Sequence, residues 1–145
     1  MSEIKIKKDP TGFSKSIIKK YDDNTEFFFH KLEFLDKIIL NIAINGVQDT
    51  TFEIPMTTKT TINYMSAIEQ DFEDQSPEPR LIIGNHDNLK IHIVASQIGK
   101  LILQSNPKDL IISIGSKWFG KGDDIESDDF DKLMFVLANV KTLLQ

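Results

Sequence analysis

The stretch "KIILNIAINGVQDTTFEI", residues 37–54, contains two apolar segments joined by an Asn-Gly dipeptide. In the first segment every second side chain is apolar, which is typical of a β-strand with one buried face; these are Ile38, Leu40, Ile42 and Ile44. Asn45-Gly46 suits a type I′ turn, because both of its central residues take a positive φ angle. In the second segment Phe52 and Ile54 share a face. The stretch therefore predicts a β-hairpin made of strands 37–44 and 47–54.

The segment before it, "EFFFHKLEF" at 26–34, is rich in aromatic residues and ends at a turn. It predicts another strand and extends the hairpin to an antiparallel meander over residues 26–54. Alternation places Phe28 and His30 on one face and Phe27 and Phe29 on the other, with Lys31. The face with Phe27 and Phe29 needs cover, either from a helix of this chain or from a partner protein.

The second half of the chain changes from strand to helix periodicity. "RLIIG" (80–84) and "DLIISIG" (109–115) are typical of short buried strands. From Leu89 the apolar residues recur at helical spacing, with Asp87 or Asn88 as the N-cap and the helix ending before Pro107. Ser127 is predicted to cap a last helix, whose apolar stripe comprises Phe130, Leu133, Met134, Leu137, Val140 and Leu144.

The length of 145 residues suggests a single domain over 1–145. The predicted fold class is α+β: a mainly antiparallel sheet of about six strands with two amphipathic helices packed on it. A Lys-rich N-terminal segment (1–24) and a flexible acidic, proline-containing loop (66–79) are expected to flank these elements. A further strand around Thr60–Met65 fits the pattern less well.

The sequence Gly84-Asn85-His86-Asp87 resembles one ligand block of a two-metal phosphoesterase. Two metal ions need about four oxygen or nitrogen ligands each, from several separated blocks. The chain has three histidines, His30, His86 and His92, and no Asp-x-His. These residues are better explained as a turn from a strand into a helix.

Other catalytic and nucleic-acid-binding patterns are missing from the sequence. It has no Gly-x-Ser-x-Gly and no Gly-Lys-Ser/Thr phosphate loop. The net charge of −5 disfavours nucleic acid as the main ligand. The absence of cysteine excludes disulfides and thiolate metal sites and fits a reducing compartment, hence the cytoplasm and possibly the nucleus. We expect a binding protein, not an enzyme, with no catalytic residue, cofactor, metal or membrane contact.

Three segments of the second half resemble the small proteasome-assembly chaperones, the third and fourth members of the eukaryotic set and their fungal counterparts. They are "RLIIGNHDNLKIHIVASQIGKLILQ", "KDLIISIGSK" and "FDKLMFVLANVKTLL". The shared features are a strand ending at Ile82-Ile83-Gly84, a helix with the small residue Ala95 near its middle, and a strand ending at Ile112–Gly115. The pattern "LIIGN…QIGKLI…ISIG" favours the fourth member.

The resemblance implies a chaperone subunit without enzymatic activity. Such proteins pair with a second small assembly chaperone as a heterodimer, and the dimer binds a 20S proteasome α subunit, mainly of the α5 type. It promotes assembly of the α-ring and dissociates when β subunits arrive at the same face. A longin- or roadblock-like adaptor domain remains an alternative, and a small metal-dependent hydrolase using His86 is a weaker one.

Exposed aromatic residues are the usual anchors of a protein interface. Trp118 and Phe119, in a Gly-flanked loop, are candidate contacts, or else fold back as a lid on the core. Phe27 and Phe29 are candidates if a partner covers their face of the sheet. Asp123 and Asp124, in the acidic segment 123–131, could steer a charged partner.

Overall fold

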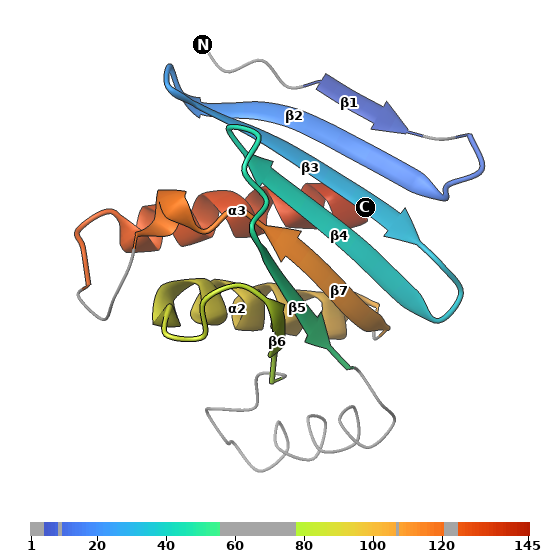
Figure 1. Cartoon of the computed structure of the whole chain (residues 1–145). Coiled ribbons are helices and arrows are strands. Elements are labelled where there is room, and N and C mark those ends of the chain that lie inside the picture. The colour runs from blue at the N-terminus through green and yellow to red at the C-terminus, as the bar shows by residue number, and fades with distance from the viewer. Residues whose placement is uncertain (1–4, 9, 56–77, 107, 121–124) are drawn as a thin grey trace.

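The computed structural model describes residues 5–8, 10–55, 78–106, 108–120 and 125–145, which form one sheet with two α-helices (Figure 1). The strands are β1 (Lys5–Lys8), β2 (Ser14–Asp22), β3 (Thr25–Glu33), β4 (Lys37–Ile44), β5 (Thr50–Ile54), β6 (Arg80–Ile83) and β7 (Asp109–Ile114). The helices are α2 (Leu89–Ser105) and α3 (Asp129–Leu144), with a short 3-10 helix η1 (Lys117–Phe119). The α+β class is confirmed, with seven described strands where about six were expected.

The strand order in the sheet is β1-β2-β3-β4-β7-β5-β6. All described pairings are antiparallel except the one between β4 and β7. Parallel neighbours need a long crossover connection, and α2 lies in the connection that leads into β7. The sheet is therefore mixed, with a parallel pair at its centre (Figure 1).

The predicted hairpin of strands 37–44 and 47–54 is wrong, although its turn is right. Asn45 and Gly46 both have positive φ angles, 51° and 77°, as a type I′ turn requires. Only the bridge between Ile44 and Val47 follows the turn. Beyond it β7 inserts between β4 and β5, so β5 pairs with β7 and not with β4.

Gly115 lies where β7 ends beneath this turn. Its amide donates a hydrogen bond of 3.1 Å to the carbonyl oxygen of Ile42, which continues the β4–β7 ladder. A Cβ atom at this position would lie 2.4 Å from the carbonyl oxygen of Val47. The turn and the end of β7 therefore approach so closely that only glycine fits.

Both helices cover the same face of the sheet (Figure 1). The strand residues that point toward them are buried and paired in register, for example Phe29 with Ile42, and Ile42 with Ile114. Helix α2 contributes buried Ile91, Ala95 and Ile98, and α3 contributes other side chains, including Val136, Val140 and Leu143. Burial of this apolar surface is the main favourable term in folding.

The N-terminal Lys-rich segment forms strands, which the sequence analysis did not predict. β1 pairs with β2, and β2 pairs with β3, so the segment extends the sheet at one edge. Ile17 of β2 is buried, and Lys15 Nζ donates hydrogen bonds of 3.0 and 2.9 Å to the carbonyl oxygens of Thr142 and Gln145 at the end of α3. The segment thus helps to hold α3 on the sheet.

The helix starts are partly as predicted. Asn88 is the N-cap of α2, and its side-chain oxygen accepts a hydrogen bond of 3.2 Å from the amide of Ile91. The N-cap of α3 is Asp128, not Ser127. At the start of α3 the carboxylate of Asp129 accepts a hydrogen bond from the amide of Glu126.

The predicted stripe of α3 is shifted. Val140 is buried and Leu133, Leu137 and Leu144 pack against the core, but Phe130 and Met134 are exposed. Val136, Asn139 and Leu143 are buried instead.

Glu33, at the end of β3, is hydrogen-bonded to its own strand and to the segment that connects α2 with β7. Its carboxylate accepts hydrogen bonds from Lys31 Nζ (3.1 Å), Lys108 Nζ (3.0 Å) and Asn106 Nδ2 (3.3 Å). Partial burial alone would raise the pKa of Glu33, but the bonds and charges of Lys108 and Lys31 outweigh it and hold the pKa below its ordinary value.

The strand Thr60–Met65 and most of the loop 66–79 lie outside the described residues. Pro79, at the end of that loop, is buried, and β6 begins at the next residue.

Replacing Gly115 with alanine is expected to lower the free energy of unfolding by about 2 kcal/mol or more, because a backbone carbonyl must move to admit the Cβ atom. Urea unfolding measures the change. Gly46→Ala is the matched control, since its φ is positive but nothing lies within 4 Å of the added atom, so it reports backbone strain of about 1 kcal/mol. Equal losses in the two variants would contradict the close approach at Gly115.

The lowered pKa of Glu33 means that the fold favours its charged form. The resulting stabilisation is complete above the ordinary pKa of about 4.5 and is lost as the pH falls through the lower folded value. We expect Glu33→Gln to be less stable than the wild type at pH 7, and the difference to shrink between pH 5 and pH 3. Urea unfolding across this pH range checks it, with Glu26→Gln as the control at an exposed position of the same strand. A difference that stays constant with pH would refute the role of the charge.

Candidate protein-binding surfaces

The Gly84-Asn85-His86-Asp87 block is a turn from β6 into α2. Gly84 has a φ of +134°, a conformation that favours glycine. Asn85 Oδ1 accepts a hydrogen bond of 2.9 Å from the amide of Asp87, and Asn88 then caps the helix. His86 is exposed.

Among the described residues, the one group of potential metal ligands close enough together is Glu126, Asp128 and Asp129. This group contains no histidine, and Asp129 is engaged by Lys90, whose Nζ lies 3.2 Å from Oδ2. Exposed acidic groups of this kind are ordinary helix N-terminal residues, where negative charge is favourable. The described residues therefore do not assemble the ligand set of a two-metal phosphoesterase.

Trp118 lies at the centre of an aromatic cluster between the sheet and α3. Its ring makes edge-to-face contacts with Phe27, Tyr21 and Phe119, with centroid separations of 4.7, 4.9 and 5.0 Å. Phe135 of α3 lies 5.0 Å from Phe27 in the same arrangement. Such pairs stabilise by roughly 0.5–1.5 kcal/mol beyond the apolar area that they bury.

Lys132 fastens the loop that carries Trp118 to α3. Lys132 Nζ donates a hydrogen bond of 2.7 Å to the carbonyl oxygen of Trp118 and lies 5.0 Å from the centre of its ring. The η1 segment is thus held on the core as a lid, which was one of the two alternatives for it.

The candidate contact residues fall into different environments. Phe27, Phe29 and Phe119 are 0%, 0% and 4% exposed, so the structure places them in the core and corrects the expectation of surface anchors. Alternation along β3 separated its two faces correctly but could not tell which face the helices cover. Trp118 is half-buried and keeps part of its ring at the surface. Asp123 and Asp124 lie outside the described residues.

The opposite side of the sheet carries an apolar surface that sequence reasoning missed as a binding candidate. We call it the sheet face. Its members are adjacent in register across four strands; they are Ile18, Phe28, Leu32, Ile39, Ala43 and Ile111. Phe28 is 40% exposed, and neither described helix covers this side of the sheet (Figure 1).

A row of polar side chains crosses the sheet face and is hydrogen-bonded internally. Asn41 joins His30, with 3.3 Å between Asn41 Nδ2 and His30 Nδ1, and accepts a bond of 2.8 Å from Gln48 Nε2. The hydroxyls of Thr51 and Ser113 lie 2.9 Å apart. Polar groups that are already paired with one another lose less on leaving water, so a partner can cover this face at a lower cost.

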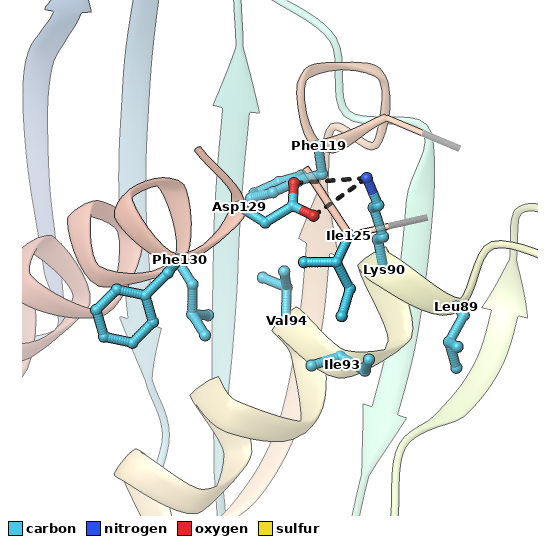
Figure 2. A pocket seen from close by; sticks show the side chains of 9 residues that line it. Leu89, Lys90, Ile93, Val94, Phe119, Ile125, Asp129 and Phe130 are labelled. Carbon is cyan, nitrogen blue, oxygen red and sulfur yellow. Dashed lines mark hydrogen bonds and ion pairs between the residues drawn. The ribbon is translucent and has the colours of Figure 1, made fainter. Parts of the chain in front are cut away.

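A second apolar surface lies between the first turns of α2 and α3. We call it the helix groove. Its volume is about 350 Å³, and it is lined by Leu89, Lys90, Ile93, Val94, Phe119, Ile125, Asp129, Phe130 and Leu133 (Figure 2). Within it Lys90 Nζ pairs with Asp129. The hydrogen bond from the amide of Glu126, together with Lys90, lowers the pKa of Asp129 and keeps it charged.

Neither described helix is long and apolar enough to cross a membrane.

Comparison with known proteins identifies a family and a shared fold. The family model described as "20S proteasome chaperone assembly proteins 3 and 4" matches residues 1–141. Among solved structures, a chain of a chaperone complex for yeast 20S proteasome assembly superposes with a TM-score of 0.62 and 22% sequence identity. The superposition covers 100% of this chain and 99% of that chain, which shows that the two share a fold. No curated protein matches this chain by sequence.

Trp118→Ala tests whether Trp118 supports the fold. We expect the free energy of unfolding to fall by about 3 kcal/mol, because several aromatic contacts are lost and a cavity remains. Chemical denaturation measures the change. Phe130→Ala is the control: its side chain is 69% exposed, so the loss should stay below about 1 kcal/mol. A Trp118→Ala protein as stable as the control would contradict the role of Trp118 in the core.

Proposed function

Because the chain belongs to the family of 20S proteasome chaperone assembly proteins 3 and 4, we propose that it is a chaperone subunit that acts by protein binding alone. It pairs with a second small assembly chaperone, and the resulting heterodimer binds a proteasome α subunit of the α5 type. The complex promotes assembly of the α-ring in the cytoplasm and the nucleus, and leaves when β subunits take its place. The family match over residues 1–141 carries this proposal.

The sheet face is the surface that we assign to the second chaperone. It is largely apolar, continuous across β2, β3, β4 and β7, and covered by neither of the described helices. Polar groups that an interface buries need hydrogen-bond partners, and the His30–Asn41–Gln48 row, which runs between the two apolar rows of the sheet face, is already hydrogen-bonded. The yeast protein with the same fold was solved as part of a chaperone complex, which supports a partner of similar kind.

Transient pairing fits the composition of the sheet face. Its apolar side chains are separated by polar ones, whereas the inner face of β4 and β7 is apolar throughout, with Ile38, Leu40, Ile42, Ile44, Leu110, Ile112 and Ile114 all buried. Permanent interfaces resemble a protein core cut in half, whereas interfaces that must separate are more polar. The sheet face therefore suits a complex that forms and later dissociates.

The test of the proposed function is native mass spectrometry of the tagged protein isolated from its own cells. We expect a complex with one other small protein and a proteasome α subunit. A protein that is found alone, or with partners unrelated to the proteasome, would contradict the proposal.

Phe28→Asp tests the assigned surface. A charge among the apolar residues of the sheet face is expected to raise the Kd for the second chaperone at least about tenfold, because burying phenylalanine contributes roughly 1.5–3 kcal/mol. Isothermal titration calorimetry measures the Kd. Leu35→Asp is the control, since Leu35 is 96% exposed in the turn between β3 and β4. If Phe28→Asp binds like the control, the second chaperone uses another surface.

A further inference from the structure

Several of the large apolar side chains that line the helix groove are exposed to solvent. Ile125 is 92% exposed, Phe130 is 69% exposed, and Leu89 and Ile93 are 48% and 45% exposed. All four side chains border one hollow of about 350 Å³, whose base is formed by buried Val94 and Phe119 (Figure 2). Clustered exposed apolar side chains of this kind mark a binding site more often than isolated ones do.

The polar groups of the helix groove are already engaged with one another. Lys90 Nζ lies 3.2 Å from Asp129 Oδ2 and 3.7 Å from Glu126 Oε1, and its side chain is only 12% exposed. Small-molecule sites orient their ligands through a few converging polar groups that remain available. Since the ammonium and the carboxylates satisfy each other here, the groove suits apolar side chains of a protein better than a polar small molecule.

The rim of the helix groove is acidic. Glu126 and Asp128, whose carboxylates lie close to that of Asp129, have side chains that are 57% and 51% exposed. The two nearby lysines point inward: Lys90 and Lys132 are 12% and 13% exposed. The negative charges therefore face the solvent while the positive charges are covered, and the rim attracts a basic partner.

We propose that the helix groove is the docking site for the proteasome α subunit, which inserts apolar side chains that are flanked by lysine or arginine. This inference rests on the proposed function and says which surface of the chaperone contacts the α subunit. The apolar hollow and the acidic rim together indicate the kind of partner: an apolar side chain in the groove, and basic neighbours against Glu126 and Asp128. The groove lies on the helix side of the sheet, so a second chaperone on the sheet face leaves it accessible (Figure 1).

The test uses the full chain in complex with its second chaperone and a purified α5-type subunit as the probe. In the groove variant, Ile125 and Phe130 are both replaced by serine. Both side chains are largely exposed, so the fold should be retained, as near-UV circular dichroism and thermal unfolding would verify. We expect the Kd for the α subunit to rise at least about tenfold, with the affinity for the second chaperone unchanged. Leu35→Ser is the control, because Leu35 is as exposed as Ile125 but lies outside the groove.

A second variant tests the acidic rim. Glu126→Gln combined with Asp128→Asn removes two exposed charges and leaves the Lys90–Asp129 pair in place. We expect weaker binding of the α subunit at low salt and a smaller dependence of its Kd on ionic strength.

The outcomes separate this inference from the proposed function. A groove variant that binds the α subunit like the wild type overturns the inference alone. So does a variant that loses the second chaperone instead, because the groove would then belong to the chaperone pair. If the wild-type complex binds no α subunit, the proposed function fails, and the docking site fails with it.

Discussion

The position of β7 between β4 and β5 is the constraint on which the rest of the structure depends. β7 pairs in parallel with β4 and in antiparallel with β5, so it joins the N-terminal strands to the C-terminal half of the chain. The insertion is possible because the chain turns away from β4 immediately after Gly46. It also requires Gly115, which has no side chain and so allows the backbone of Val47 to lie against the end of β7. With β7 in this position, α2 and α3 both lie on the face to which the buried side chains of Ile112 and Ile114 point.

Local features of the fold could be predicted from the sequence, and long-range pairing could not. The Asn45-Gly46 turn, the N-cap at Asn88 and the α+β class all follow from patterns within about twenty residues. Which strand lies beside β4 depends on the burial of β7, some seventy residues away in the chain, and alternation carries no information about it. An Asn-Gly turn between two alternating segments ordinarily joins neighbours, and here tertiary packing prevails over that preference.

The N-terminal strands were missed for a related reason. β2 has three lysines among nine residues, and one of its side chains, Ile17, is fully buried. The sequence pattern is that of a solvated segment. The strand forms because β3 supplies a pairing edge and because α3 receives Ile17 and Lys15.

The binding surfaces were less predictable than the fold. Sequence reasoning identified the aromatic residues but could not decide which of them the helices would cover. Phe27 and Phe28 are adjacent in the chain; Phe27 is fully buried beneath α3, and Phe28 is 40% exposed on the side that neither described helix covers. Alternation therefore places the two residues on opposite faces of the sheet. Which of the two faces is buried depends on where the helices lie. For the helix groove, the signal available was the exposed Phe130, which the helical stripe had assigned to the core.

The separation of the two surfaces has a consequence for how such a chaperone is released. The sheet face and the helix groove share none of the residues that define them, and the tightly packed core of Phe27, Trp118 and Phe135 lies between the helices and the sheet. Packed cores transmit binding energy between sites most directly when they have two discrete arrangements of similar energy. A core fixed by interlocking aromatic rings and by the Gly115 contact favours one arrangement, so the two partners would bind independently. Under the proposed function, dissociation from the α-ring would then follow more readily from competition for the occupied surface than from a change of shape in the chaperone.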